Sequence, residues 1–143
     1  MAFGASDDAM GVGEAVIVAG IGCRKGATAA QIEAAMNAAL ERAGRPLARL
    51  DLMATAESKR AEAGLAAAAS ARGLRLVFVE QGELEIAGAR GATWSSRVLA
   101  LAGVPSVAEA AALAAAGPKA RLILPRIVVG PVTCALASAE GAP

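Results

Sequence analysis

The chain has 143 residues with a formal net charge of +1, and only 2% of its residues are aromatic. This length fits one domain, while the charge and the scarcity of aromatic rings exclude the basic, base-stacking surface of a nucleic-acid-binding protein and a polybasic membrane patch. Histidine is absent altogether, which excludes Ser-His and Cys-His catalytic pairs and removes the commonest metal ligand.

The two ends of the chain are expected to flank a single domain. Residues 1–13 are small and polar and lack a basic start followed by an apolar run, which predicts a disordered lead-in and not a signal peptide. The domain is expected to span 14–138, with a short tail at 139–143. The apolar stretch 98–116 is interrupted by a proline and a glutamate and consists largely of alanine, so we do not expect it to cross a membrane.

The chain contains two cysteines, Cys23 and Cys134. Two cysteines do not form a disulfide framework, and neither has neighbours at the spacing of metal ligands. We therefore expect a reduced, cytoplasmic protein with no metal site and no bound cofactor. Cys134 lies in an apolar run and is interpreted as a core residue.

The first expected elements are a strand and a helix joined by a glycine-rich turn. A continuous apolar run at 15–19 is typical of a strand buried on both faces. The spacing of Thr28 and Gln31 forms a capping box, which predicts a helix that ends near residues 43–44. The core side of this helix is indicated by residues that recur four apart, Ile32, Met36 and Leu40.

Two more strands and a second helix follow. An Arg-Pro turn leads into an expected strand at 49–54, and an alanine-rich helix is expected at 62–72, where a glycine ends it. The apolar run 76–79 predicts a third strand. Alternation of strands and helices in this order indicates right-handed crossovers and a parallel sheet.

The second half of the chain departs from this alternation. Residues 80–97 mix glycines with charged residues around Trp94, which predicts a long, functional loop. A capping box then opens an expected helix at 106–117. A Gly-Pro turn joins expected strands at 121–129 and 132–137 into an antiparallel pair. The sequence therefore predicts an α/β fold, namely a single three-layer α/β/α domain with a mixed, mostly parallel sheet and a C-terminal antiparallel strand pair.

The junction between the first strand and the first helix is the leading candidate for a binding site. Its glycines, Gly20, Gly22 and Gly26, permit a close backbone approach, and Arg24 and Lys25 add positive charge beside a helix N-terminus. This combination predicts an anion site. The alternative is that any strand-to-helix turn favours glycine. The spacing also lacks the third glycine of a dinucleotide fingerprint, because Lys25 stands there.

A second group of polar residues follows the next strand, at the same expected edge of the sheet. Thr55 and Lys59 are candidates to face the same crevice as the first turn, since open parallel sheets bind ligands beyond the carboxyl ends of their strands. Lys59 and Glu62 equally fit an ordinary surface pair. Cys23 beside two cations is a candidate thiolate nucleophile, with a packing cysteine as the alternative. Candidate catalytic residues are thus Cys23, Lys59 and Glu62.

Four residues later in the chain have both a binding and a structural interpretation. Ser106 and Glu109 have the spacing of a capping box, which accounts for Glu109 without any ligand. Thr133 is a ligand candidate or merely a strand residue, and Arg126 is expected to be solvated.

Several segments together resemble the family of cobalamin biosynthesis proteins that includes CobE and the C-terminal domain of CbiG. The resemblance covers roughly residues 14–138. It rests on Gly20-Ile21-Gly22-Cys23-Arg24-Lys25-Gly26, on Lys59 with Glu62-x-Gly64-Leu65, on Pro105-Ser106-Val107-Ala108-Glu109-Ala110-Ala111-Ala112-Leu113, and on Val132-Thr133-Cys134-Ala135-Leu136-Ala137.

The resemblance implies a protein that binds, protects or hands on a precorrin or corrin intermediate of the oxygen-dependent pathway. The expected partners are that intermediate, other corrin-pathway enzymes and a second copy in a homodimer, with no nucleic acid and no membrane. Trp94 and Arg90 are expected to cover an apolar face of the ligand. The ligand contacts are expected to come from Gly20, Gly22, Cys23, Arg24, Lys25, Gly26, Thr55, Lys59, Ser106, Glu109 and Thr133.

Two other functions remain open at the level of the sequence. The first is an enzyme that acts on a corrin side group, with hydrolase-like lactone chemistry as in CbiG. This chain lacks the N-terminal part of that larger protein, so the resemblance does not carry the hydrolase activity over. The second is a nucleotide- or phosphate-binding domain that uses the same glycine-rich turn.

Overall fold

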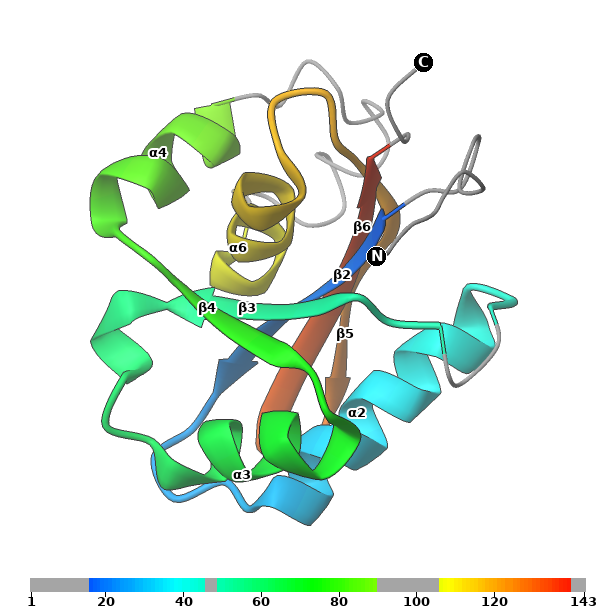
Figure 1. Cartoon of the computed structure of the whole chain (residues 1–143), viewed down its shortest axis with the longest axis vertical. Coiled ribbons are helices and arrows are strands. Elements are labelled where there is room, and N and C mark those ends of the chain that lie inside the picture. Colours follow the sequence, from blue (N-terminus) through cyan, green and yellow to red (C-terminus); the bar gives the residue numbers. More distant parts are fainter. Residues whose placement is uncertain (1–15, 46–48, 90–105, 140–143) are drawn as a thin grey trace, which may run out of the picture.

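The computed structural model describes residues 16–45, 49–89 and 106–139. In these parts of the chain a five-stranded sheet lies between two layers of helices (Figure 1). The strands are β2 (Val16–Cys23), β3 (Leu52–Ala56), β4 (Arg75–Val79), β5 (Arg121–Val129) and β6 (Val132–Ala139). The helices are α2 (Ala29–Arg42), the short 3-10 turn η1 (Glu57–Lys59), α3 (Ala63–Arg72), α4 (Gln81–Ala89) and α6 (Val107–Ala116).

The sheet has the strand order β4-β3-β2-β6-β5 and confirms the expected mixed architecture. β4, β3 and β2 run parallel to one another, whereas β6 pairs antiparallel with both β2 and β5. The C-terminal hairpin therefore lies beside the first strand and not at the far side of the third. Cys23 at the end of β2 pairs with Val132 at the start of β6, which brings the β5–β6 turn to the carboxyl end of β2.

Alternate residues of β2 separate two hydrophobic cores, one on each face of the sheet. Ile17 and Ile21 pack into the core beneath α2 and α3. Val18 packs into the other core, which α4 and α6 cover with a stretch of alanines and Leu113. This period of two in a strand buried on both faces is the reason that its sequence is a continuous apolar run.

Both expected capping boxes are confirmed. The side chain of Thr28 accepts a hydrogen bond from the N–H of Gln31, whose side chain caps Thr28 in return, and α2 begins there. Ser106 and Glu109 make the same reciprocal pair at the start of α6. Because each pair satisfies two N–H groups at a helix end, the sequence alone is sufficient to fix where these helices begin.

Three expectations about element boundaries are wrong. The strand expected at 49–54 is β3 at Leu52–Ala56, so Thr55 lies within it. β2 continues to Cys23, so Gly20 and Gly22 lie in a strand and not in a turn. Residues 81–89 form helix α4, where a loop was expected from the glycines. Leu84 and Ala87 on this helix are buried against the core under α6, and this packing overrides the low helix propensity of Gly82 and Gly88. Arg90 and Trp94, expected to cover a ligand, lie outside the described residues.

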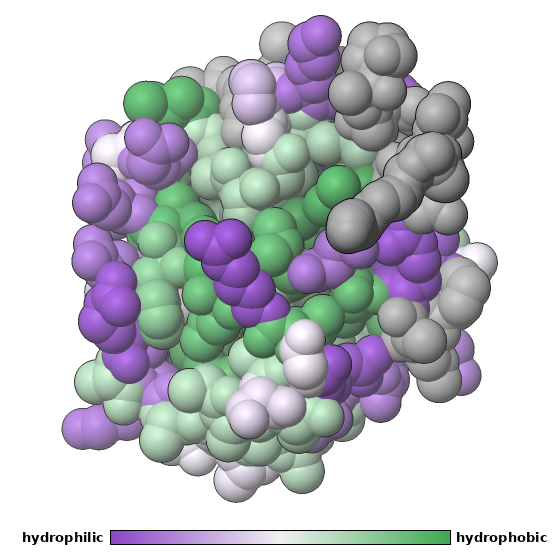
Figure 2. Space-filling model, viewed as in Figure 1, coloured by the Kyte–Doolittle hydropathy of each residue, from purple (hydrophilic) through white to green (hydrophobic). Residues whose placement is uncertain are grey.

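The surface seen in Figure 2 shows hydrophobic residues gathered around β4, with hydrophilic residues along the left margin. Leu76, Val77 and Phe78 of this edge strand are half-buried. Arg60 stacks over the ring of Phe78 at 4.2 Å from its centroid, so a cation covers part of this apolar area. Among the described helices, none is long and apolar enough to cross a membrane.

Candidate functional site

A pocket of about 500 Å³ lies at the carboxyl ends of β2 and β3. The end of β2, η1, the first residue of α6 and the β5–β6 turn surround it. Its described lining residues are Gly22, Cys23, Arg24, Ala56, Ser58, Lys59, Val107, Val128, Gly130, Pro131 and Thr133. This is the place where open parallel sheets commonly bind ligands, and its volume is typical of small-molecule sites.

The pocket combines positive charge with apolar surface. Arg24 is exposed and Lys59 is half-buried, and none of the described lining residues carries a carboxylate. Val107 is 48% exposed and Val128 is 70% exposed, so both present apolar surface at the pocket. A ligand suited to these walls carries negative groups on a body with apolar surface.

The backbone of the turn at 24–28 does not form the expected anion cradle. Four of its N–H groups already have acceptors in the protein. Two of them reach distant segments, since the Arg24 N–H donates to Pro131 O at 2.9 Å and the Gly26 N–H to Glu62 Oε1 at 2.9 Å. The other two bonds are local, from the Ala27 N–H to Arg24 O at 3.1 Å and from the Thr28 N–H to Gln31 Oε1 at 2.9 Å. These four N–H groups are therefore not free to hold a ligand, contrary to what is expected of a glycine-rich turn. Positive charge reaches the pocket through side chains instead.

The two strand glycines have different roles. A methyl group on Gly20 would meet the backbone of α6, and Gly20 is buried and does not line the pocket. Its lack of a side chain allows helix and sheet to approach closely. Gly22 is half-buried, lines the pocket and faces Thr133 across the ladder with β6. Of the strand glycines, only Gly22 is thus placed where a ligand contact is expected.

Three other expected ligand contacts lie away from the pocket lining. Thr55 is fully buried, and its hydroxyl donates to the carbonyl oxygen of Ile21 at 2.7 Å, which ties β3 to β2. Lys25 and Gly26 are exposed on the outer side of the turn and are not among the lining residues. Thr133, by contrast, does line the pocket, as expected.

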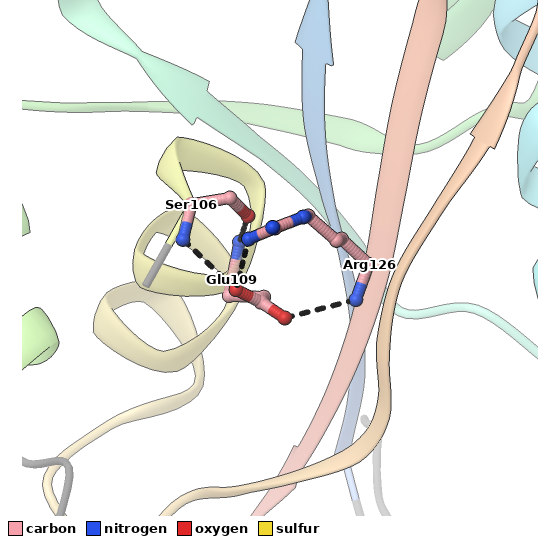
Figure 3. Close-up of polar contacts among 3 residues, drawn as sticks. All are labelled: Ser106, Glu109 and Arg126. Atoms are coloured by element: carbon pink, nitrogen blue, oxygen red, sulfur yellow. Dashed lines mark hydrogen bonds and ion pairs between the residues drawn. The ribbon is translucent and has the colours of Figure 1, made fainter. Parts of the chain in front are cut away.

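Glu109 is a structural carboxylate, and Figure 3 shows how its oxygens are occupied. The side chain is fully buried; Oε1 accepts from the Ser106 N–H at 2.8 Å and Oε2 from the Arg126 N–H at 3.0 Å. The Arg126 guanidinium completes the cluster at 3.5 Å, so the expectation that Arg126 is merely solvated is wrong. The register of β5 shifts between Leu124 and Ile127, and Arg126 lies within this shift. Glu109 therefore joins the start of α6 to β5.

Ser106 lies near the candidate pocket without lining it. It borders a smaller cavity of about 230 Å³ between α4 and α6, which shares Val107 with the larger pocket. Val107 follows the Ser106 cap directly, so the Glu109 network places this valine at the rim of both cavities. The structure thus assigns Ser106 and Glu109 to the support of the pocket wall.

The surroundings of Cys23 favour the neutral thiol over the thiolate that the neighbouring cations suggest. Burial raises the pKa of the Cys23 thiol; Lys59 opposes this shift, and the Glu62 carboxylate adds to it. Because β2 extends to Cys23, the residue lies in a strand and not at the N-terminus of a helix. Cys134 is fully buried, and burial raises its pKa to about 12, as expected for a core thiol.

Cys23, Lys59 and Glu62 are brought together, as expected of residues at one edge of the sheet. Cys23 and Lys59 line the pocket, and Glu62 lies behind them with its carboxylate bonded to the Gly26 N–H. Ser58, which follows β3 beside Lys59, lines the pocket as expected of the polar residues after that strand. Sequence reasoning missed Val107, Val128 and Pro131. The place of Val128 and Pro131 in the pocket depends on the pairing of β6 with β2, for which the local sequence gives no signal. Among the described residues, no group of three or more potential ligands surrounds a metal site.

Comparisons with known proteins identify a family for residues 17–137, which match the model described as "Cobalamin synthesis G C-terminus". A curated relative, Protein CobE from Sinorhizobium, is 36% identical over 121 residues, which cover 85% of this chain and 79% of CobE. The crystal structure of cobalamin biosynthesis protein ChiG from Agrobacterium tumefaciens is similar to this chain, with a TM-score of 0.73 and 52% sequence identity. The match covers 85% of this chain and 97% of the ChiG chain. A crystal structure of CobE is also similar, with a TM-score of 0.75 and 34% sequence identity. The match covers 90% of this chain and 94% of the CobE chain.

Proposed function

This chain belongs to the cobalamin biosynthesis family of CobE and the CbiG C-terminal domain, and from that premise we propose that it binds a precorrin or corrin intermediate in the pocket beside Arg24 and Lys59. In this proposal the protein protects the intermediate and hands it on to other enzymes of corrin synthesis. No covalent step is required of its residues.

The chemistry of the pocket walls supports this proposal. Precorrins carry acetate and propionate groups around a flat macrocycle. The Arg24 guanidinium and the Lys59 ammonium suit the carboxylates, while Val107 and Val128 suit the apolar faces of the ring. Each charge-assisted hydrogen bond contributes roughly 1.5–3 kcal/mol, so two of them supply about 3–6 kcal/mol toward binding, and the apolar contact adds to this.

The single observation that carries the proposal is the composition of the pocket. Two cations and two exposed valines line one cavity, and no carboxylate is found among its described lining residues. Apolar side chains that line a cavity together with a few charged groups are typical of a ligand-binding site. A ligand with only phosphates would satisfy the cations and leave the valines uncovered.

A titration followed by visible absorbance tests the proposal. A corrin polycarboxylic acid added to the protein should give a spectral change that saturates at one equivalent. Its fully esterified form, which keeps the macrocycle but lacks the charges, should bind at least tenfold more weakly. The proposal is rejected if neither form changes the spectrum, or if both bind equally.

Hydrolase-like chemistry on a corrin side group is the second candidate. The observation that favours it is the proximity of Cys23, Lys59 and Glu62, two of which face the pocket. The raised pKa of Cys23 and the bonded state of Glu62 weigh against it. The mass of the recovered ligand decides between the two functions, because a binding protein returns its ligand unchanged and a hydrolase returns a product over many turnovers.

Nucleotide binding is the least supported of the three functions. Phosphate sites in α/β folds use free backbone N–H groups at a glycine-rich turn. In this turn, four of these groups are bonded to protein acceptors. An increase in melting temperature on addition of ATP or NAD(P) would support nucleotide binding, and an unchanged melting temperature would exclude it.

A further inference from the structure

The start of helix α3 carries two residues that are locally unfavourable. Glu62 occupies the N-cap position but makes no side-chain cap hydrogen bond, although serine, threonine, aspartate and asparagine are the effective residues there. Gly64 lies in the first turn, where alanine would favour a helix by up to about 1 kcal/mol. Residues that are unfavourable for their own helix commonly make a contact with another part of the fold.

Glu62 and Gly64 both lie against the turn at 24–28. Glu62 Oε1 accepts a hydrogen bond from the Gly26 N–H at 2.9 Å, across 36 positions of sequence. A methyl group on Gly64 would lie 2.2 Å from the carbonyl oxygen of Ala27, closer than any real contact allows. The Glu62 carboxylate thus bonds to the turn and not to its own helix α3, and the lack of a side chain at Gly64 allows α3 to approach the turn closely.

The opposite side of the turn is also held. The Arg24 N–H donates to the carbonyl oxygen of Pro131 at 2.9 Å, at the bend between β5 and β6. Arg24 therefore stands between two fixed contacts, one to the hairpin and one to α3. Lys59 belongs to η1, which precedes α3, so the Glu62 contact joins the two backbone segments that carry the cations of the pocket.

We propose that Glu62 is a positioning residue that clamps the 24–28 turn, so that Arg24 and Lys59 are held at the spacing of two carboxylates on one ligand. This inference rests on the proposed function of the pocket. Its physical basis is preorganisation, because a loop that is already ordered does not lose entropy when the ligand binds. Glu62, taken from the sequence as a catalytic candidate, acts here through Gly26 and does not touch the ligand.

Cys23 provides a second, ligand-free measure of the same cluster. Its thiol lies in the pocket, and the Glu62 carboxylate raises its pKa while Lys59 lowers it. Removal of the Glu62 charge should therefore increase the fraction of thiolate and the rate of alkylation at neutral pH. A residue that only stabilised the fold would not change this rate in the folded protein.

The test compares Glu62→Ala and Glu62→Gln with wild type, and uses Glu57→Gln as the matched control. Glu57 lies on η1 and pairs with Arg60, away from the turn, so its substitution makes the same change of charge without touching Gly26. Glu62→Ala should weaken binding of a corrin polycarboxylic acid about tenfold. Glu62→Gln keeps an acceptor oxygen and should recover most of that loss, while Glu57→Gln should bind as wild type.

Two measurements on the free protein complete the test. Amide hydrogen exchange at Gly26 should accelerate in Glu62→Ala, and Cys23 alkylation should accelerate in Glu62→Gln but not in Glu57→Gln. Circular dichroism melting confirms that each variant is folded. Unchanged exchange at Gly26, or wild-type affinity in Glu62→Ala, overturns the clamp. Failure of the wild type to bind any corrin rejects the proposed function, and the exchange rate at Gly26 then still decides whether the clamp exists.

Discussion

A side chain on Gly20 would bring its Cβ to 1.9 Å from the carbonyl oxygen of Ala108. Gly20 lies at the centre of β2 and Ala108 in the first turn of α6, so the two backbones are in direct contact at this point. The nearest further atoms belong to Ala112, one helical turn along, at 2.8 Å. The sheet–helix contact that supports Val107 at the pocket rim therefore depends on the absence of a side chain at one position of β2.

Gly20→Ala should destabilise the protein strongly. The added methyl group has no room, so α6 must move away from the sheet, at a cost of about 3 kcal/mol or more in the free energy of unfolding. Gly22→Ala is the matched control, because its methyl group would meet the Cβ of Thr133 at an ordinary 3.8 Å. Urea unfolding measures both. Equal stability of the two variants would contradict the close contact of α6 with β2.

Glu109→Ala should destabilise the protein by about 2–3 kcal/mol, because it leaves the N–H groups of Ser106 and Arg126 without their acceptor inside the fold. Arg126→Ala keeps its backbone N–H and removes a guanidinium that is partly in water, so it should cost only about 1 kcal/mol or less. The free energies of unfolding in urea give the order of the two effects. The reverse order would show that the ion pair, and not the backbone contact, holds β5 to α6.

Arg24→Gln should weaken corrin binding about tenfold while Lys25→Gln changes it less than twofold. The two residues are adjacent in sequence and carry the same charge, but only Arg24 lines the pocket. Isothermal titration with a corrin polycarboxylic acid measures both affinities at the same salt concentration. Similar losses would indicate a general electrostatic attraction, and the proposed contact with Arg24 would then be wrong. Melting temperatures of both variants should equal that of wild type, since both side chains are exposed.

The buried thiol of Cys134 should make the protein less stable in alkali. Its pKa is raised from 9.0 to about 12 in the folded state, so folding favours the neutral thiol. The resulting stability is fully present below pH 9, where both states hold the proton, and is lost as the pH rises from 9 towards 12. The unfolding free energy measured from about pH 8 upwards should fall less steeply in Cys134→Ala. The chain has no tyrosine to titrate in the same range. An unchanged slope would contradict the burial of this thiol.

Labelling with iodoacetamide should distinguish the two cysteines. Cys23 is half-buried at the pocket and should react slowly at neutral pH, because burial raises its pKa, whereas Cys134 should react only after unfolding. Mass spectrometry before and after denaturation counts the labels. A bound corrin should protect Cys23 and leave the count after denaturation unchanged. Rapid labelling of both thiols in the folded protein would contradict this arrangement.

The sequence was a sound guide where structure depends on neighbours along the chain. The Thr28 and Ser106 capping boxes, the C-terminal hairpin and the continuous apolar runs of the central strands are all confirmed. It failed where a distant contact changed the outcome. Gly82 and Gly88 suggested a loop, yet the burial of Leu84 and Ala87 holds a helix there.

The candidate site shows the same division. The sequence identified Cys23, Arg24 and Lys59 because all three lie at or just beyond the carboxyl ends of parallel strands, which meet at one edge of the sheet. It predicted that backbone N–H groups of the turn would hold the anion together with Arg24 and Lys25, because N–H groups at a glycine-rich turn are usually free. Glu62 and Pro131, far away in the chain, occupy two of them here.

The sequence by itself determined the three-layer architecture, the helix starts and the edge of the sheet at which charge gathers, because each depends on composition or on short-range spacing. The family was indicated by the motifs that the chain shares with CobE and the C-terminal domain of CbiG. Only the tertiary structure decided that β6 pairs with β2 and that the buried Glu109 side chain joins the start of α6 to β5 by hydrogen bonds. The same holds for the positive charge at the pocket, which comes from the side chains of Arg24 and Lys59. These features are contacts between segments far apart in the chain. Hydrogen-bonding groups and buried charges choose their partners only after packing has brought the segments together.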